Sequence, residues 1–177
     1  MDTERETIEA SLKAIVAGCR MCKMAATRRS TVFYRGHKNP VVLFVGEAPG
    51  KYEDMKGLPF VGPSGRLLDK EIITAGLGLV AIGMTNVVKC RPIDHEGNNR
   101  PPSEEEIASC LPFIRQQIDL LKPRVVVAVG KVAKEALRAY SPIYVLHPSA
   151  ALRKPDLLDI LQRHLKQVKE AVDRLSR

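Results

Sequence analysis

Four cysteines carry the clearest chemical signal in this sequence of 177 residues. Cys19 and Cys22 form a C-x-x-C pair, and Cys90 and Cys110 stand far downstream. Four thiolates complete the coordination of a zinc ion or an iron–sulfur cluster and leave no open position, so the pattern predicts a structural metal site. Spacing alone does not choose between zinc and a cluster. Four small buried apolar side chains are the alternative without a metal.

A second set of residues follows apolar runs that are typical of buried parallel strands, at 41–45, 84–88, 124–129 and 143–146. Glu47 follows the first run, Asn86 and Cys90 end the second, Gly130 follows the third, and His147 follows the fourth. The carboxyl ends of parallel strands meet at one edge of a sheet, where α/β proteins bind their ligands. We therefore expect these residues to share one crevice.

The segments between these runs have helical patterns. Helices are expected from the N-terminus to about residue 17, from Ser64 to 75, from Ser103 to 121, from Gly130 to 139, and from Pro155 to about 175. Ser64 and Ser103 are the predicted N-caps, and Ser103 forms a capping box with Glu106. Residues 18–40 and 91–102 are expected to be loops. The alternation predicts one α/β domain over residues 1–177, a three-layer α/β/α sandwich with a four-stranded, mostly parallel sheet.

The composition agrees with a globular protein that meets an anionic partner. The net charge is +8, which favours nucleic acid or an acidic membrane face, although simple solubility is an equal alternative. Tryptophan is absent and aromatic residues make up 5%, which is few for a protein that stacks successive bases of a single strand. The opening MDTERETIEA is charged, unlike a signal peptide, and no run is long enough to span a membrane. We expect a cytoplasmic monomer.

Five segments of the chain resemble the family 4 uracil-DNA glycosylases: GEAPG (46–50), KYED (51–54), GLPFVGPSGRLLD (57–69), TNVVKCRP (85–92) and HPSAALRKP (147–155). The resemblance implies a four-stranded parallel sheet between helices and an enzyme that hydrolyses the N-glycosidic bond of uracil in DNA. It identifies Cys19, Cys22, Cys90 and Cys110 as ligands of a 4Fe–4S cluster. The sequence departs from the family in a longer gap between Cys90 and Cys110 and a short stretch before His147, which puts the substrate range in question.

The resemblance also implies how a flipped uracil is held. His147 is expected to donate a hydrogen bond to uracil O2 as the base leaves as an anion. Asn86 is expected to read O4 and N3–H, which rejects cytosine, and Phe60 to stack on the ring. Without the resemblance, a surface histidine is the favoured interpretation of His147 and an ordinary core side chain that of Phe60, whereas Asn86 suits the cap of a strand end equally well.

The first motif supplies the rest of the predicted base pocket. Main-chain amides of Glu47 and Ala48 are expected to hold the uracil edge, in a turn fixed by Pro49. Several relatives in the superfamily have an aspartate in place of Ala48 that orients the attacking water, so Glu47 is expected to position the water or stabilise the sugar cation. Glu53 is expected to line the pocket and exclude the thymine methyl, or else to be a solvated acidic residue.

DNA is expected to be bound mostly through its phosphates. The candidates are Lys51, Ser64, Arg66, Lys131, Ser149, Arg153 and Lys154, with Leu152 as a wedge that fills the space left by the flipped base. Other functions stay open: excision of another deaminated base such as hypoxanthine, DNA binding without catalysis, or a zinc protein that binds a nucleotide.

Overall fold

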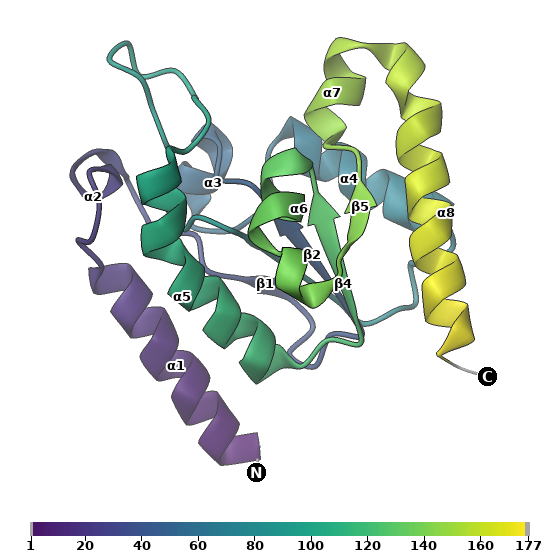
Figure 1. Ribbon diagram of the computed structural model, residues 1–177, viewed down its shortest axis with the longest axis horizontal. Helices are drawn as coiled ribbons and strands as arrows, with labels where there is room; N and C mark the ends of the chain where they lie inside the picture. Colours follow the sequence, from purple (N-terminus) through teal and green to yellow (C-terminus); the bar gives the residue numbers. More distant parts are fainter. Residues whose placement is uncertain (1, 176–177) are drawn as a thin grey trace.

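The computed structural model describes residues 2–175 and has an α/β architecture with helices on both faces of one sheet (Figure 1). Its helices are α1 (Asp2–Gly18), α2 (Met24–Thr27), α3 (Lys51–Lys56), α4 (Pro63–Thr74), α5 (Glu104–Leu121), α6 (Lys131–Ala136), α7 (Pro148–Arg153) and α8 (Leu158–Arg174), with 3₁₀ turns η1 (Arg138–Tyr140) and η2 (Pro155–Leu157). Its strands are β1 (Arg35–Gly36), β2 (Val42–Gly46), β3 (Ile82–Asn86), β4 (Val125–Val129) and β5 (Ile143–Val145).

The sheet has the strand order β1-β3-β2-β4-β5, and β2 to β5 are parallel. The chain passes from β2 to β3 on one side and later returns to place β4 on the other side of β2. The strand order therefore reverses at β2, and such switch points are where open α/β sheets form their binding crevices.

Alternate residues of β2 show how the sheet separates two apolar cores. Leu43 and Val45 pack with α1, α5 and α6, whereas Val42 and Phe44 pack with α4 and α8. All four side chains are fully buried, which explains why this strand is a continuous apolar run rather than an alternating one. In Figure 1, α1 and α5 lie on one side of the strands and α8 on the other.

The sequence predicted the α/β class and the long elements, and these are confirmed. Helix α5 begins at the predicted capping box: the Glu106 carboxylate accepts from the Ser103 N–H at 2.8 Å, and Ser103 Oγ accepts from the Glu106 N–H at 3.2 Å. The expected cap at Ser64 is wrong, because Gly62 is the N-cap and Pro63 opens α4. Proline suits that first position, since it lacks the N–H that would be unpaired there.

The sheet has five strands rather than the predicted four. The extra strand, β1, is two residues long, pairs antiparallel with β3, and lies in the segment 18–40 that was expected to be a loop. Short helices α2, α3 and α7 were also not predicted, because four to six residues are too few to show a helical period. The second strand runs over 82–86 instead of 84–88. No helix in the described part of the chain is long and apolar enough to cross a membrane.

Candidate active site

A cleft of about 480 Å³ opens at the carboxyl-terminal edge of the sheet. Glu47 follows β2, Asn86 ends β3, Gly130 follows β4 and His147 comes after β5, and all four line this cleft. The convergence expected from the apolar runs is present for these residues. Cys90 was expected in the same crevice, and it lies instead in a separate cavity because the chain turns away from the cleft after Asn86. Four further residues predicted to bind the base also line the cleft: Ala48, Pro49, Glu53 and Phe60.

Asn86 and Phe60 meet over a glycine. Asn86 is only 3% exposed and pairs in register with Gly46 of the neighbouring strand β2. A Cβ atom at Gly46 would lie 2.5 Å from Asn86 Oδ1 and 2.7 Å from Phe60 Cζ. Any larger residue at Gly46 would displace both side chains, so this glycine brings a polar amide and an aromatic ring together at the cleft.

The main chain at Phe60 adopts a left-handed conformation, with φ at 55°. A bulky residue rarely takes this conformation, and it costs on the order of 1–3 kcal/mol unless its surroundings impose it. Gly65 of α4 lies directly against it, since a Cβ atom there would lie 2.0 Å from the Phe60 carbonyl oxygen. The glycine at position 65 allows α4 to pack against the turn that presents the ring.

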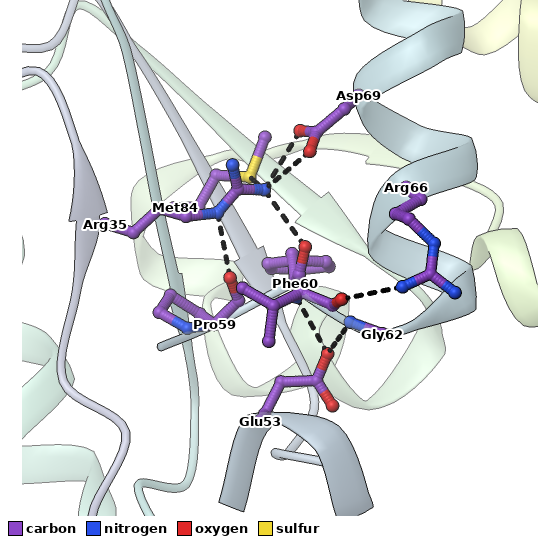
Figure 2. A network of polar contacts seen from close by, with 9 residues as sticks. Arg35, Glu53, Pro59, Phe60, Gly62, Arg66, Asp69 and Met84 are labelled. Atoms are coloured by element: carbon purple, nitrogen blue, oxygen red, sulfur yellow. Dashed lines mark hydrogen bonds and ion pairs between the residues drawn. The ribbon is translucent and has the colours of Figure 1, made fainter. Parts of the chain in front are cut away.

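Charged side chains hold this turn from both sides (Figure 2). The Glu53 carboxylate accepts hydrogen bonds from the main-chain N–H groups of Gly50, Val61 and Gly62 at 3.1, 2.9 and 2.7 Å. Arg35 donates to the carbonyls of Pro59 and Phe60 at 2.9 and 3.1 Å and pairs with Asp69 at 2.9 Å. Arg66 donates to the Val61 carbonyl at 3.2 Å. Arg35 and Asp69 were not predicted, because neither lines the cleft. Arg35 acts on the main chain of the Phe60 turn, and Asp69 acts through Arg35.

His147 caps helix α7, and its hydrogen bonds assign its protons. Nδ1 accepts from the Ser149 N–H at 3.2 Å and lies 2.8 Å from Ser149 Oγ. Because Nδ1 is an acceptor, the neutral ring carries its proton on Nε2. Burial and the nearby Arg153 lower the pKa of His147, against a smaller opposing effect of Glu53. The ring is therefore a neutral donor through Nε2 at physiological pH.

Glu47 is a partly buried carboxylic acid in the cleft. Burial raises its pKa above the ordinary value for glutamate, because the surrounding protein disfavours the charged form. Ala48 beside it has no group that could orient water. Glu47 is thus the carboxylate that the first motif contributes to the cleft lining.

The loop 91–102 forms one wall of the cleft, rising above α5 in Figure 1. Pro92, Asn99, Arg100 and Pro101 from this loop line the cleft. Arg100 is held by a two-pronged ion pair with Glu106, at 2.6 and 2.7 Å, and Arg91 donates to Asn99 Oδ1 at 2.6 Å. This wall of the cleft is therefore held in place by its own ion pair and hydrogen bonds. Its residues were not predicted, although the position of the loop directly after a strand end was a usable signal.

The predicted DNA contacts divide into two groups. Ser64, Lys131, Ser149 and Arg153 line the cleft itself. Lys51, Arg66, Leu152 and Lys154 are exposed and lie outside the lining. Leu152 is 49% exposed on α7, the helix that begins at His147.

The four cysteines line a second, mostly apolar cavity between α1, the loop before α2 and the start of α5. Arg28 donates to Cys90 Sγ at 3.4 Å and to the Ala17 carbonyl at 3.1 Å, which places a positive charge beside the thiols. Among residues 2–175, no group of three Cys, His, Asp or Glu side chains is close enough to hold one metal ion. The four thiols line one cavity without forming a group that meets at a single point among the described residues.

Burial raises the pKa of the Cys90 thiol, and it raises that of Cys110 to about 11. Arg28 opposes this effect at Cys90, and the N–H and charge of Lys89 oppose it at Cys110. Thiols in such a setting stay protonated until a metal centre binds them as thiolates. The donor set is all sulfur, which suits zinc or iron–sulfur centres.

Comparison with known proteins agrees with the motifs. The model of the uracil DNA glycosylase superfamily matches residues 33–175. The chain is 36% identical over 187 aligned positions to a type-4 uracil-DNA glycosylase of Sulfurisphaera tokodaii, with 90% of this chain and 82% of the relative covered. It is 31% identical to a type-4 uracil-DNA glycosylase of Archaeoglobus fulgidus, with 88% of each chain covered. A type-4 uracil-DNA glycosylase of Thermotoga maritima is 38% identical over 73% of this chain and 65% of its own. The chain belongs to the uracil-DNA glycosylase superfamily.

Proposed function

We propose that this protein removes uracil from DNA, by flipping the nucleotide into the cleft and hydrolysing its N-glycosidic bond. The observation that carries the proposal is that Asn86, Phe60 and His147, from three distant parts of the sequence, line one cleft. Together they supply the three interactions that an extruded pyrimidine needs: hydrogen bonds to its edge, a face to stack on, and a donor for the charge it gains on leaving.

Asn86 and Phe60 select the base. The amide of Asn86 offers one donor, for O4 of uracil, and one acceptor, for N3–H. Cytosine presents the opposite pattern at both positions, so it would leave buried polar groups unpaired. Phe60 stacks on the ring, and Glu53 and Arg35 are positioning residues that hold the Phe60 turn.

His147 stabilises the leaving group. Cleavage leaves positive charge on the sugar and negative charge on uracil, so a neutral N–H at O2 is worth more in the transition state than in the bound substrate. The hydrogen bond from the Ser149 N–H keeps Nδ1 as the acceptor and leaves Nε2–H to donate. Gly130 lies beside His147: a Cβ atom at this position would lie 3.4 Å from His147 Cβ. The absence of a side chain at Gly130 therefore leaves space for the imidazole ring.

Glu47 acts on the sugar side of the reaction. As an ionised carboxylate it orients the attacking water or stabilises the developing cation, and the main-chain amides around Ala48 and Pro49 hold the uracil edge. Lys131, Ser149, Arg153 and Ser64 meet the phosphates next to the flipped nucleotide, and the net charge of +8 favours association with DNA.

The four cysteines hold a 4Fe–4S cluster in this proposal, with zinc as the less favoured occupant. The all-sulfur donor set around one cavity suits either group, and the resemblance of the motifs to family 4 enzymes favours the cluster. Its contribution is a structural crosslink between the segment before α2, the chain after β3 and helix α5. Arg28 offsets part of the negative charge of the bound thiolates.

Release of free uracil from a labelled oligonucleotide tests the function, with otherwise identical cytosine and thymine substrates for comparison. We expect release from uracil only. His147→Ala should slow single-turnover cleavage by about 10²–10³-fold, as expected for loss of one transition-state donor. Asn86→Asp should slow uracil release and reduce the preference over cytosine, because a carboxylate cannot donate to O4.

Matched controls make the same chemical changes away from the cleft. His37→Ala and Asn39→Asp alter exposed residues between β1 and β2, beside the start of β3, and both should cleave uracil at the parent rate. Failure of the parent protein, with its metal site loaded, to release uracil at any salt concentration would contradict the proposal. Hypoxanthine belongs in the same panel because its O6 and N1–H match the pattern of uracil O4 and N3–H.

A further inference from the structure

Lys89 is a buried lysine between the cleft and the cysteine cavity. Only 1% of its surface is exposed, although it is one of the longest side chains in the core. It follows Asn86 by three residues and directly precedes Cys90. A buried ammonium group is rare unless its hydrogen bonds are satisfied, so its partners indicate what it holds.

Three oxygen atoms satisfy the three N–H donors of the ammonium group. Nζ donates to Asn86 O at 2.6 Å, to Thr85 Oγ1 at 2.8 Å and to Gln117 Oε1 at 2.5 Å. The network is anchored further on, since Thr85 Oγ1 and Gln117 Nε2 both donate to the Phe33 carbonyl, at 2.8 and 3.0 Å. Lys89 therefore connects the end of β3 to helix α5.

The peptide unit that joins Asn86 to Val87 is fixed at both of its polar ends. Its N–H, from Val87, donates to the Gly46 carbonyl at 2.8 Å. Its carbonyl, from Asn86, accepts from Lys89 Nζ. The tilt of this peptide plane sets the direction in which the Asn86 side chain leaves the main chain. Without Lys89, the plane would be held at one end only.

Lys89 also borders the other site. The residue lines the cysteine cavity together with Cys90 and Cys110. The segment 86–90 is thus a short link with a cleft residue at one end and a cysteine ligand at the other. No other residue of this segment lines the cysteine cavity while its side chain holds the main chain of Asn86.

We propose that Lys89 is a positioning residue for uracil recognition: its ammonium group fixes the main-chain carbonyl of Asn86 and so aims the Asn86 amide into the cleft. The inference rests on the proposed function of the cleft. It adds a residue that never contacts the base and that links base selection to the integrity of the cysteine site.

A double-mutant cycle on the metal-loaded, full-length protein tests the proposal. Lys89→Met keeps an unbranched side chain of similar length and removes the ammonium group. We expect single-turnover uracil release to fall by about ten- to a hundredfold, the usual effect of a misplaced binding group. In an Asn86→Ala background, Lys89→Met should have almost no further effect, because the residue through which it acts is already gone. If Lys89→Met lowered the rate of uracil release by the same factor in the parent and in the Asn86→Ala background, the proposal would be overturned.

Gln117→Met is the matched control. It also removes one partner from the buried network and so should lower stability, but it leaves the bond from Lys89 to Asn86 in place. Measured at a temperature where both variants are folded, Gln117→Met should retain a rate near that of the parent. Equal losses in Gln117→Met and Lys89→Met would mean that Lys89 acts only through stability, which contradicts a positioning role.

Two further measurements separate the possible failures. If Lys89→Met does not fold, the double variant Lys89→Met/Gln117→Leu replaces it. In this variant the Gln117 amide, which would have lost its lysine partner, is also exchanged for an apolar side chain. The double variant should still cleave slowly. A crystal structure of either variant reports the position of Asn86 without reference to turnover. An Asn86 amide displaced from Gly46 supports the proposal, and an unmoved amide refutes it. Absence of uracil release by the parent protein would instead contradict the proposed function.

Discussion

At the scale of single residues, burial in the protein shifts the protonation of two side chains of the site, Glu47 and His147. Glu47 and His147 both lie in the cleft, and burial moves their pKa values toward each other: it raises that of the glutamate and lowers that of the histidine. Both shifts favour the neutral form. A neutral histidine suits donation to a leaving anion. A glutamate that acts as a carboxylate must instead be ionised in a site whose burial disfavours the ionised form.

The pH dependence of Glu47 follows from that conflict. Its raised pKa means that the folded protein binds this proton more tightly than the unfolded chain, so ionising Glu47 lowers stability as pH rises through the window above the ordinary glutamate pKa. We expect Glu47→Gln to cleave more slowly yet melt at a higher temperature at pH 7, with the gain in stability shrinking as the pH falls through that window.

Rate profiles check the same residue. The parent should lose activity on the acid side at a pH above 4.5, the ordinary pKa of glutamate, and Glu47→Gln should lack this limb. His147→Gln should be slower and keep the limb. A parent rate that stays constant down to about pH 4.5 would show that ionised Glu47 is not required.

At the scale of elements, the sequence located the ends of the parallel strands to within two residues and missed the small turns. Apolar runs placed Glu47, Asn86, Gly130 and His147 at one edge of the sheet because buried parallel strands leave a pattern that needs no tertiary knowledge. The turn at Phe60 has no such pattern. Its shape depends on Arg35 and on other residues far away in sequence, so it becomes visible only in three dimensions.

The contact between α4 and the Phe60 turn gives a sharp test. Gly65→Ala should force the turn away, because the new Cβ would lie 2.0 Å from the Phe60 carbonyl oxygen. Overpacking of this kind costs about 1–3 kcal/mol or more, and uracil release should fall with the displaced ring. Gly78→Ala is the control, since its Cβ would meet nothing closer than 3.8 Å. Thermal melting and single-turnover rates measure both effects.

At the scale of the whole molecule, the cysteine cavity lies where the segment before α2, the chain after β3 and helix α5 meet. We expect Cys90→Ala to give less soluble protein, with less bound iron and weaker visible absorbance, because loss of a metal site removes folding free energy. Ala108→Ser, a similarly small change on the exposed face of α5, should retain both. Full iron content in purified Cys90→Ala would exclude this cysteine as a ligand.

The distribution of charge makes a second prediction at this scale. Binding to DNA should weaken with salt, and Arg153→Ala or Lys131→Ala should each reduce the slope of log affinity against log salt by about one unit if it contacts a phosphate. Lys166→Ala on α8, away from the cleft lining, should leave the slope unchanged. Affinity titrations at several salt concentrations separate these cases, and equal slopes for all three variants would place the DNA elsewhere.

The left-handed backbone at Phe60 has a consequence for how a nucleotide is captured. Glu53, Arg35 and Gly65 hold the turn in that conformation within the protein alone, so the aromatic platform exists before any nucleic acid arrives. For the proposed stacking of a base on Phe60, the surface is already formed, so the protein loses little conformational entropy on binding. The conformational energy of the left-handed Phe60 backbone is therefore part of the folding free energy, and it does not add to the free energy of binding in each catalytic cycle.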